Sequence, residues 1–302
     1  MRIVVTGATG FIGPLLSTRL VAKGHDVVVL TRDASRSRDH LHPRVRVVSW
    51  ADGAPDWEGV LDGAGGVVNL AGESIAQRWT AAAKERIVSS RVGAAAKLRL
   101  AIEKAKQRPA VLVNASAVGY YGPRGDETLT EDSPAGADFL AETCVKWEEA
   151  ARAIEPLGVR VVRVRTGIVL GDDGGALAKM LPPFRAFVGG PLGSGTQWMS
   201  WIHRDDLVEL VLFALENPKV TGALNGTAPS PVTMKAFATA LGHALHRPSL
   251  APAPAAALKI LLGEMSTLIL DGQRVLPKRA LDLGFTFRFT DVEAALKDAV
   301  GA

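Results

Sequence analysis

The sequence has 302 residues, of which 47% are hydrophobic and 22% charged, an ordinary balance for a folded globular protein. This balance excludes a disordered or fibrous chain, and the formal net charge of +4 is too weak to indicate nucleic-acid binding by itself. The single cysteine, Cys144, excludes an intramolecular disulfide framework and favours a reducing compartment. No apolar run approaches the ~20 residues of a membrane span, and glycines interrupt the first one, so we expect a cytoplasmic protein without signal peptide or membrane segment.

Valine-rich runs alternate with helical stretches through the first 170 residues. Continuous apolar runs are typical of strands that are buried on both faces of a parallel sheet. The predicted strands are Ile3–Thr6, Val27–Thr31, Val45–Ser49, Val67–Leu70, Val111–Ala115 and Val159–Val164, and the predicted helices are Phe11–Lys23, Thr80–Lys106 and Asp138–Glu155. This alternation predicts an α/β fold with a Rossmann-type doubly wound parallel sheet.

The rest of the chain has a different pattern. Residues Leu177–Val188 are predicted to form a helix that Pro182 and Pro183 break or kink, and Asp205–Glu216 an amphipathic helix. Shorter helices are expected at Met234–Leu245, Ala255–Leu262 and Val292–Ala299. We therefore expect residues 1–170 to form a nucleotide-binding domain and residues 171–302 a smaller, mostly helical substrate lobe, with residues 203–228 packing back on the first domain.

A glycine-rich turn joins the first predicted strand to the first predicted helix. Residues Thr6–Gly13 read TGATGFIG, with the spacing G-x-x-G-x-x-G. Gly7 permits the tight turn, Gly10 lets the backbone approach a pyrophosphate, and Gly13 lets the helix pack closely on the sheet. The helix N-terminus then faces the phosphates with its unpaired N–H groups. The predicted cofactor contacts here are Gly7, Thr9, Gly10, Phe11, Ile12 and Gly13.

The end of the second predicted strand indicates which dinucleotide binds. NAD sites usually carry an Asp or Glu here, whereas this sequence has Thr31 and Arg32, with Arg36 close behind. A guanidinium suits a 2′-phosphate in charge and geometry, so NADP(H) is favoured over NAD(H). The alternative is a solvated basic loop whose charge Asp33 compensates. The end of the fourth strand and the helix after it supply further predicted cofactor contacts at Leu70, Ala71, Gly72, Arg86 and Arg91.

These motifs resemble the extended short-chain dehydrogenase/reductases of the epimerase and dehydratase type. The shared segments are Thr6–Gly13, Asn69–Gly72 and Ser116–Gly122, and further segments at Arg78–Val92, Gly189–His203 and Leu262–Arg279 resemble an atypical epimerase-like branch with its own C-terminal domain. The resemblance covers essentially the whole chain. It implies a Rossmann domain that carries NADP and a small substrate lobe. The resemblance does not identify the substrate. Some members of the branch are described as related to cell division.

In the wider family a Ser, a Tyr and a Lys four residues after the Tyr carry out the proton transfer that accompanies hydride transfer. By this resemblance, Ser116 takes the first role and Lys146 the third, and both would also contact the cofactor. Glu142 stands four residues before Lys146, where the family has Tyr, and a carboxyl group is a far stronger acid than a phenol (about 4.3 against about 10). Three readings stay open: Tyr121, or its neighbour Tyr120, donates the proton; Glu142 acts as a base in another reaction; or the site binds cofactor without turnover.

The resemblance and the composition also define the expected ligands and partners. The segment after the sixth predicted strand should run beside the nicotinamide, which makes Val169 a cofactor candidate. No metal is expected, because one cysteine and six histidines show no ligand spacing backed by carboxylates. The predicted function is an NADP(H)-binding, epimerase-like oxidoreductase acting on a nucleotide-sugar or small carbonyl substrate, as a monomer or homodimer without nucleic-acid or membrane partners. The alternative is an NADP-binding regulatory protein without classical turnover.

Overall fold

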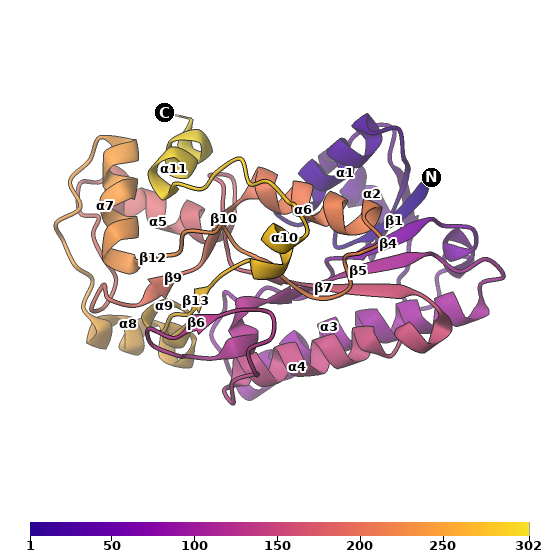
Figure 1. The fold of residues 1–302 in the computed structure, drawn as a ribbon, viewed down its shortest axis with the longest axis horizontal. Helices are drawn as coiled ribbons and strands as arrows, with labels where there is room; N and C mark the ends of the chain where they lie inside the picture. Colours follow the sequence, from indigo (N-terminus) through magenta and orange to yellow (C-terminus); the bar gives the residue numbers. More distant parts are fainter. Residues whose placement is uncertain (302) are drawn as a thin grey trace.

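A seven-stranded parallel sheet forms the centre of the molecule in a computed structural model, which describes residues 1–301 (Figure 1). The strand order is β11-β7-β5-β4-β1-β2-β3 and every neighbouring pair is parallel. The strands are β1 (Arg2–Thr6), β2 (Asp26–Thr31), β3 (Arg46–Ser49), β4 (Gly66–Asn69), β5 (Val111–Ala117), β7 (Arg160–Thr166) and β11 (Gly222–Gly226). The predicted Rossmann-type fold is confirmed, and the seventh strand, β11, is one that the sequence pattern did not predict.

The valine-rich strands divide their side chains between two cores. Successive residues of a strand point to opposite faces of the sheet. Val4 of β1 accordingly packs in one hydrophobic cluster, with Val28 and Val67, whereas Val5 packs in the other, with Val29. Burial on both faces is the physical reason why these strands read as continuous apolar runs.

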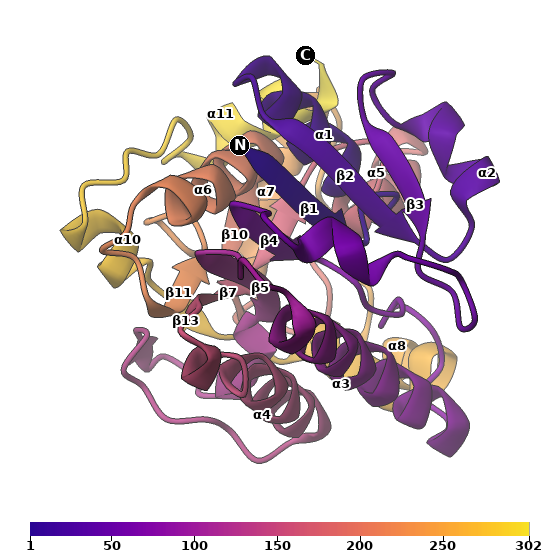
Figure 2. The same cartoon turned by 90° about the vertical axis from the view of Figure 1, so that its right-hand side faces the viewer.

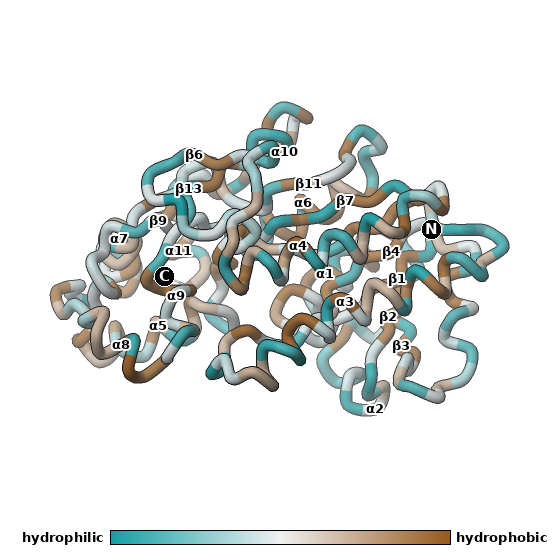
Figure 3. The backbone as a smooth tube through the Cα atoms, turned by 90° about the horizontal axis from the view of Figure 1, so that it is seen from below, coloured by the Kyte–Doolittle hydropathy of each residue, from teal (hydrophilic) through white to brown (hydrophobic). Residues whose placement is uncertain are grey.

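Helices cover both faces of this sheet, as Figure 2 shows. On one side lie α1 (Gly13–Ala22) and α6 (Arg204–Glu216), which contact each other. On the other side α3 (Ala81–Lys104) packs along α4 (Phe139–Arg152). The short α2 (Ala34–Ser37) follows β2, in a stretch that is mainly hydrophilic (Figure 3). The layers leave the carboxyl ends of the strands free, which is where open α/β sheets bind ligands.

A third hydrophobic cluster holds the C-terminal part of the chain together. It includes residues of α5 (Gly175–Arg185), α7 (Met234–Leu245) and α11 (Val292–Val300). Three short strand pairs accompany it: β8 (Ile168–Leu170) with β10 (Trp201–His203), parallel; β9 (Trp198–Met199) with β12 (Val232–Thr233), antiparallel; and β6 (Thr128–Leu129) with β13 (Arg274–Val275), parallel, which joins the C-terminal part to the first part of the chain. The remaining α-helices are α8 (Ala255–Leu262), α9 (Thr267–Leu270) and α10 (Lys278–Asp282), and short 3₁₀ turns lie at Arg38–His40, Glu58–Leu61, Val118–Tyr121, Glu155–Leu157 and Gly263–Ser266.

The two prolines of α5 do not interrupt it. The helix continues through Pro182 and Pro183 to Arg185, so the predicted break is wrong. Both prolines lie in the last turn, and only two or three residues follow them before the helix ends. A proline removes one N–H and crowds the preceding turn, a cost that the packing of Leu177, Leu181 and Phe184 in the core offsets.

Candidate dinucleotide site

Two of the three glycines in the turn after β1 are required by close backbone contacts. Gly7 has φ +68°, and a Cβ there would lie 2.5–2.7 Å from the peptide group between Leu70 and Ala71. A Cβ on Gly13 would overlap the Cα and carbonyl group of Ala8. Gly10 differs, because a Cβ there would meet only the Gly7 oxygen, at 3.4 Å. Gly7 and Gly13 thus allow the turn and the helix to pack, whereas Gly10 keeps the space outside the turn open.

A cavity of about 640 Å³ opens at the carboxyl ends of β1, β2, β3 and β4. It combines eight of the predicted cofactor contacts with ten residues that the sequence analysis did not assign to a site. The lining residues are Gly7, Ala8, Thr9, Gly10, Leu30, Thr31, Arg32, Trp50, Ala51, Asp52, Leu70, Ala71, Gly72, Glu73, Ser89, Ser90, Ala94 and Lys97. The size is that of a small-molecule site.

Arg32 lies at this cavity without a charged partner. Its side chain is exposed and forms no ion pair or hydrogen bond with any of residues 1–301. Asp33 does not compensate it directly, because the Asp33 carboxylate caps α2 by accepting the Arg36 N–H at 3.1 Å and the Ser35 hydroxyl at 2.8 Å. These hydrogen bonds, the one from Arg36 first, hold the pKa of Asp33 below its ordinary value. A guanidinium is therefore free at the end of β2.

Some predicted cofactor residues lie beside the cavity rather than in its wall. Ile12 is the N-cap of α1 and contributes no side-chain hydrogen bond. The Phe11 ring packs on the loop after β8, within 2.5–3.3 Å of where Cβ atoms on Gly174 and Gly175 would lie. Val169 lies in β8 itself and is half-buried. Its carbonyl oxygen lies 3.4 Å from where a Cβ on Gly175 would lie.

The predicted arginines outside the wall have different surroundings. The backbone N–H of Arg36 donates to the Asp33 carboxylate that caps α2. Arg86 is tied to Glu73 at 3.1 Å and to Gln77 at 3.3 Å. Arg91 packs on Gly72, its Cζ 3.1 Å from the place of a Gly72 Cβ. Of the three, only Arg91 is inserted between elements of the fold.

The residues that sequence reasoning missed come largely from the end of β3 and from the middle of α3. Trp50 and Asp52 follow β3, and Lys97 of α3 forms an ion pair with Asp52. Trp50 is 8% exposed and stacks edge-on against Trp57, with ring centroids 5.9 Å apart. The position of Trp50 and Asp52 could have indicated their place, because residues directly after any parallel strand reach the ligand-binding edge of the sheet.

Ser116 lies at the carboxyl end of β5, where it binds a buried glutamate. Its hydroxyl donates to Glu148 Oε1 at 2.8 Å, and both residues are 4% exposed. Arg165 holds the same carboxylate through Nε at 2.8 Å and Nη2 at 3.0 Å. The bidentate pair fixes the carboxylate, and the carboxylate fixes the direction of the Ser116 hydroxyl.

The face of α4 that meets Ser116 carries neither a tyrosine nor a lysine. It presents Glu148 and, one turn earlier, Cys144, whose thiol donates to the Ala117 oxygen at 3.7 Å. Burial raises the pKa of Cys144 to about 12, so the thiol stays protonated at neutral pH.

Glu142 and Lys146 are exposed and precede Cys144 and Glu148 by two residues, or about 200° around the helix. The structure thus does not bring Glu142 or Lys146 to Ser116, contrary to the expectation from the resemblance.

Tyr121 is enclosed rather than open to a ligand. It is fully buried, its hydroxyl donates to Asn225 Oδ1 at 2.6 Å and accepts from Arg165 Nη1 at 3.0 Å. Burial raises the pKa of Tyr121 to about 12, against the opposing effect of Arg165. The geometry gives this phenol a place in a buried polar network and no path to a substrate. Tyr120 is partly exposed, and its ring covers the Arg165 guanidinium at 3.4 Å.

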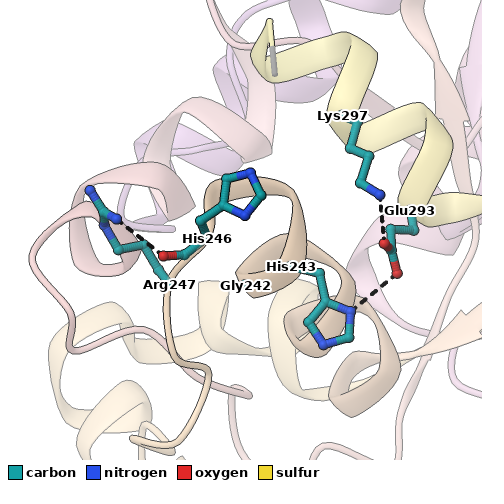
Figure 4. A pocket seen from close by; sticks show the side chains of 6 residues that line it. All are labelled: Gly242, His243, His246, Arg247, Glu293 and Lys297. Atoms are coloured by element: carbon teal, nitrogen blue, oxygen red, sulfur yellow. Dashed lines mark hydrogen bonds and ion pairs between the residues drawn. The ribbon is translucent and has the colours of Figure 1, made fainter.

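A second hollow, of about 450 Å³, lies between α7 and α11 (Figure 4). Glu293 contacts two side chains of this hollow, His243 at 3.2 Å and Lys297 at 2.8 Å. Arg247 donates to the backbone oxygen of His246 at 3.1 Å. Glu293 is thus paired within the hollow, and the side chains around it do not converge on one point (Figure 4). Across residues 1–301, no three His, Cys, Asp or Glu side chains gather closely enough to hold a metal ion.

The parallel sheet, the glycine turn and the cavity at the strand ends define a Rossmann-type fold with a cavity at the edge where such folds bind dinucleotides. The chain belongs to the NAD dependent epimerase/dehydratase family, whose model matches residues 3–225. A domain of unknown function (DUF1731) matches residues 253–299. The predicted resemblance is thereby confirmed.

Relatives of this chain are known from plants, bacteria and humans. A protein of Arabidopsis thaliana named "Epimerase family protein SDR39U1 homolog, chloroplastic" is 47% identical over 98% of this chain and 86% of its own length. The epimerase family protein YfhF of Bacillus subtilis is 41% identical over 99% and 98%. A crystal structure of the human epimerase family protein SDR39U1 (isoform 2) with NADPH superimposes with a TM-score of 0.89 at 38% identity, covering 100% of this chain and 99% of the human one.

More distant structures share the fold alone. UDP-glucuronic acid 4-epimerase from Bacillus cereus, in complex with UDP-glucuronic acid and NAD, has a TM-score of 0.79 at 17% identity, with 100% of this chain and 98% of the other covered. In the part of this chain that the structure describes, no helix is both long and apolar enough to cross a membrane.

Proposed function

We propose that this protein binds NADP(H) at the carboxyl edge of its sheet and acts as an epimerase-like oxidoreductase on a small-molecule substrate. The observation that carries the proposal is Arg32, a guanidinium without a partner at the end of β2 and in the wall of the cavity. A 2′-phosphate would complete this group with a charge-assisted, bidentate contact. The NADPH in the crystal structure of the human relative supports the same assignment.

The residues present fit a dinucleotide. The N-terminus of α1 has no side-chain cap and no acidic residue in its first turn, so its positive dipole end is open to phosphates, although Gly13 N–H already donates to the Gly10 oxygen at 3.2 Å and Pro14 has no N–H. Gly10 leaves that approach open. Thr9, Gly10 and Gly72 would hold the backbone of the cofactor, while Thr31 and Arg32 would hold its 2′-phosphoribose end.

The chemistry of the reacting end differs from the tyrosine–lysine arrangement of the wider family. Bound NADP(H) would supply or accept a hydride. In this chain Glu148 orients the Ser116 hydroxyl, and Ser116 is the residue that we propose to align the substrate. We assign Glu142 and Lys146 no role in proton transfer, because they lie on the exposed side of α4.

The cofactor proposal is tested by titrating the protein with NADPH and with NADH. Wild-type protein should bind NADPH more tightly than NADH. Replacing Arg32 with Ala should weaken NADPH by about 10- to 100-fold and NADH by less than about threefold, since only NADPH carries the 2′-phosphate. Equal or tighter binding of NADH by the wild-type protein contradicts the proposal.

A second candidate function is NADP binding without classical turnover. It is favoured by the α4 face toward Ser116, where a neutral thiol and a paired carboxylate stand. A broad screen of carbonyl compounds and nucleotide sugars for hydride transfer separates the two functions. Turnover that Ser116→Ala abolishes supports the oxidoreductase, whereas NADPH binding with no turnover in any mixture supports the regulatory protein.

The organisation of the whole protein is part of the proposal. We assign residues 1–170 to the nucleotide-binding domain and residues 171–302 to the substrate lobe, with residues 203–228 packed back on the first; the position of α6 and β11 on the main sheet supports the last point. The single, buried thiol of Cys144 supports a reducing, cytoplasmic setting. The protein would work as a monomer or homodimer.

A further inference from the structure

Arg91 occupies a position that the dinucleotide cavity does not yet explain. It projects from the middle of α3 and packs on Gly72, at the end of β4, where a Cβ would lie 3.1 Å from its Cζ and 3.3 Å from its Nη2. On its other side the guanidinium lies 5.0 Å from the ring centroid of Trp147 of α4. The guanidinium is therefore wedged between the cavity and the α4 face that meets Ser116.

The hydrogen-bonding groups at this place have few acceptors. Arg91 donates one hydrogen bond, from Nη1 to the Ile87 oxygen at 2.9 Å, and forms no ion pair with any of residues 1–301. The nearby Glu73 carboxylate accepts from Gln77 at 3.0 Å and from Arg86 at 3.1 Å, both at Oε1, and forms no hydrogen bond with Arg91.

The indole N–H of Trp147 is buried and has no hydrogen-bond partner. Burial lowers the pKa of Arg91, against opposing effects of Cys144 and Glu73, which is the signature of a desolvated cation. Buried donors are nearly always paired, so the unpaired Trp147 N–H, beside a guanidinium that makes a single hydrogen bond, indicates a missing acceptor at this place.

The strand order identifies which part of a dinucleotide would supply that acceptor. Arg32 follows β2, whereas Arg91 lies by the end of β4 and the β5 side, with β1 between them. With the 2′-phosphoadenosine end at Arg32, a dinucleotide that crosses the glycine turn brings its second nucleotide to β4 and β5. A phosphate or ribose oxygen of that half would meet the free N–H groups of Arg91.

We propose that Arg91 is a binding residue for the nicotinamide-nucleotide half of the cofactor, and that it supplies from α3 the positive charge that the inward face of α4 lacks. This inference rests on the proposed NADP(H) binding and adds that two arginines bind different halves of the cofactor. Arg32 recognises the 2′-phosphoadenosine half, so any ligand that contains 2′-phosphoadenosine can make this contact. Arg91 recognises groups that only the complete dinucleotide carries.

The test compares two probes, NADPH and adenosine 2′,5′-bisphosphate, which lacks the nicotinamide nucleotide. Dissociation constants are measured by calorimetry for wild-type protein and for Arg91→Met, Arg91→Lys, Arg32→Ala and Arg99→Met. Arg99→Met is the matched control, because Arg99 lies on the same helix, does not line the cavity, and its side chain is 43% exposed and pairs with Glu103 at 3.9 Å. Thermal unfolding of each variant reports whether it is folded.

Arg91→Met should weaken NADPH by about 10- to 100-fold and leave adenosine 2′,5′-bisphosphate within about twofold. Arg91→Lys keeps the charge with fewer donors and should lose less than Arg91→Met, which keeps the test decisive if the Met variant is unstable. Arg32→Ala should weaken both probes by similar factors, and Arg99→Met neither. NADPH binding unchanged in both Arg91 variants, or both probes weakened equally by them, overturns the inference. Wild-type protein that binds neither probe instead contradicts the proposed function itself.

Discussion

Two glycines of the turn after β1, Gly13 and Gly10, should separate effects on folding from effects on cofactor binding when each is replaced by alanine. At Gly13 the new Cβ would overlap three backbone atoms of Ala8, far inside the roughly 3.5–4.0 Å at which carbon atoms pack, and backbone cannot rotate away as a side chain can. Overpacking of this kind costs about 3 kcal/mol of unfolding free energy. At Gly10 the nearest atom is the Gly7 oxygen at 3.4 Å, so Gly10→Ala should change stability by less than about 0.5 kcal/mol.

NADPH affinity should respond most strongly to the other substitution, Gly10→Ala. A methyl group at Gly10 projects into the space that a pyrophosphate needs, so Gly10→Ala should weaken NADPH by about 10-fold or more. The assays are thermal unfolding, in which Gly13→Ala should lower Tm by roughly 6–12 °C, and NADPH titration of the folded variants. The reasoning is refuted if Gly10→Ala destabilises the protein as much as Gly13→Ala, or if it binds NADPH like the wild type.

Three further predictions concern the buried polar groups. Tyr121→Phe removes the hydroxyl between Asn225 and Arg165 and should cost about 1–3 kcal/mol in urea unfolding with NADPH affinity unchanged; an unchanged stability contradicts the network. Glu148→Ala leaves the Arg165 guanidinium buried and unpaired and should cost about 3–5 kcal/mol in the same assay, a loss below about 1 kcal/mol being incompatible with the pair. The pKa of His203 is lowered, chiefly by burial, and its Nδ1 accepts a backbone N–H at 3.2 Å, so the unfolded chain binds the proton more tightly than the folded one. The contribution of neutral His203 to the free energy of unfolding is therefore complete above the unfolded pKa of about 6.5 and is lost as pH falls below it. Urea unfolding should show this loss for the wild type and not for His203→Asn.

The fold and the cofactor turn were predictable because local chemistry specifies them. Valine runs identify buried parallel strands, and a glycine motif between a strand and a helix identifies a turn that needs glycines. The strand β11 escaped prediction because its residues, Gly222–Gly226, include two glycines and an asparagine, which read as a loop. Its strand character comes from pairing with β7, a tertiary contact that the local sequence does not contain.

The error at α4 is one of helix register. The rule that residues four apart share a face pairs Glu142 with Lys146 correctly, but it does not state which face meets the sheet. The apolar stripe of α4, formed by Ala141, Cys144, Trp147 and Ala151, contains that information. Reading the stripe first would have placed Lys146 outside and Cys144 beside Ser116.

The pairing of the buried polar groups could not be read from the sequence at all. Arg165 lies on β7, Glu148 on α4 and Tyr121 in the loop after β5. Each is a polar residue in or beside an apolar element, which marks it as unusual. Only the packed structure shows that the three meet and therefore satisfy one another.

A structure of the protein with bound NADPH tests the central claim most directly. We expect the 2′-phosphate of NADPH within about 3 Å of the Arg32 guanidinium. Its diphosphate should lie at Gly10 and the N-terminus of α1, and its nicotinamide half beside Arg91 and Ser116. NADPH bound elsewhere, or bound in this cavity with its 2′-phosphate in solvent away from Arg32, would contradict it.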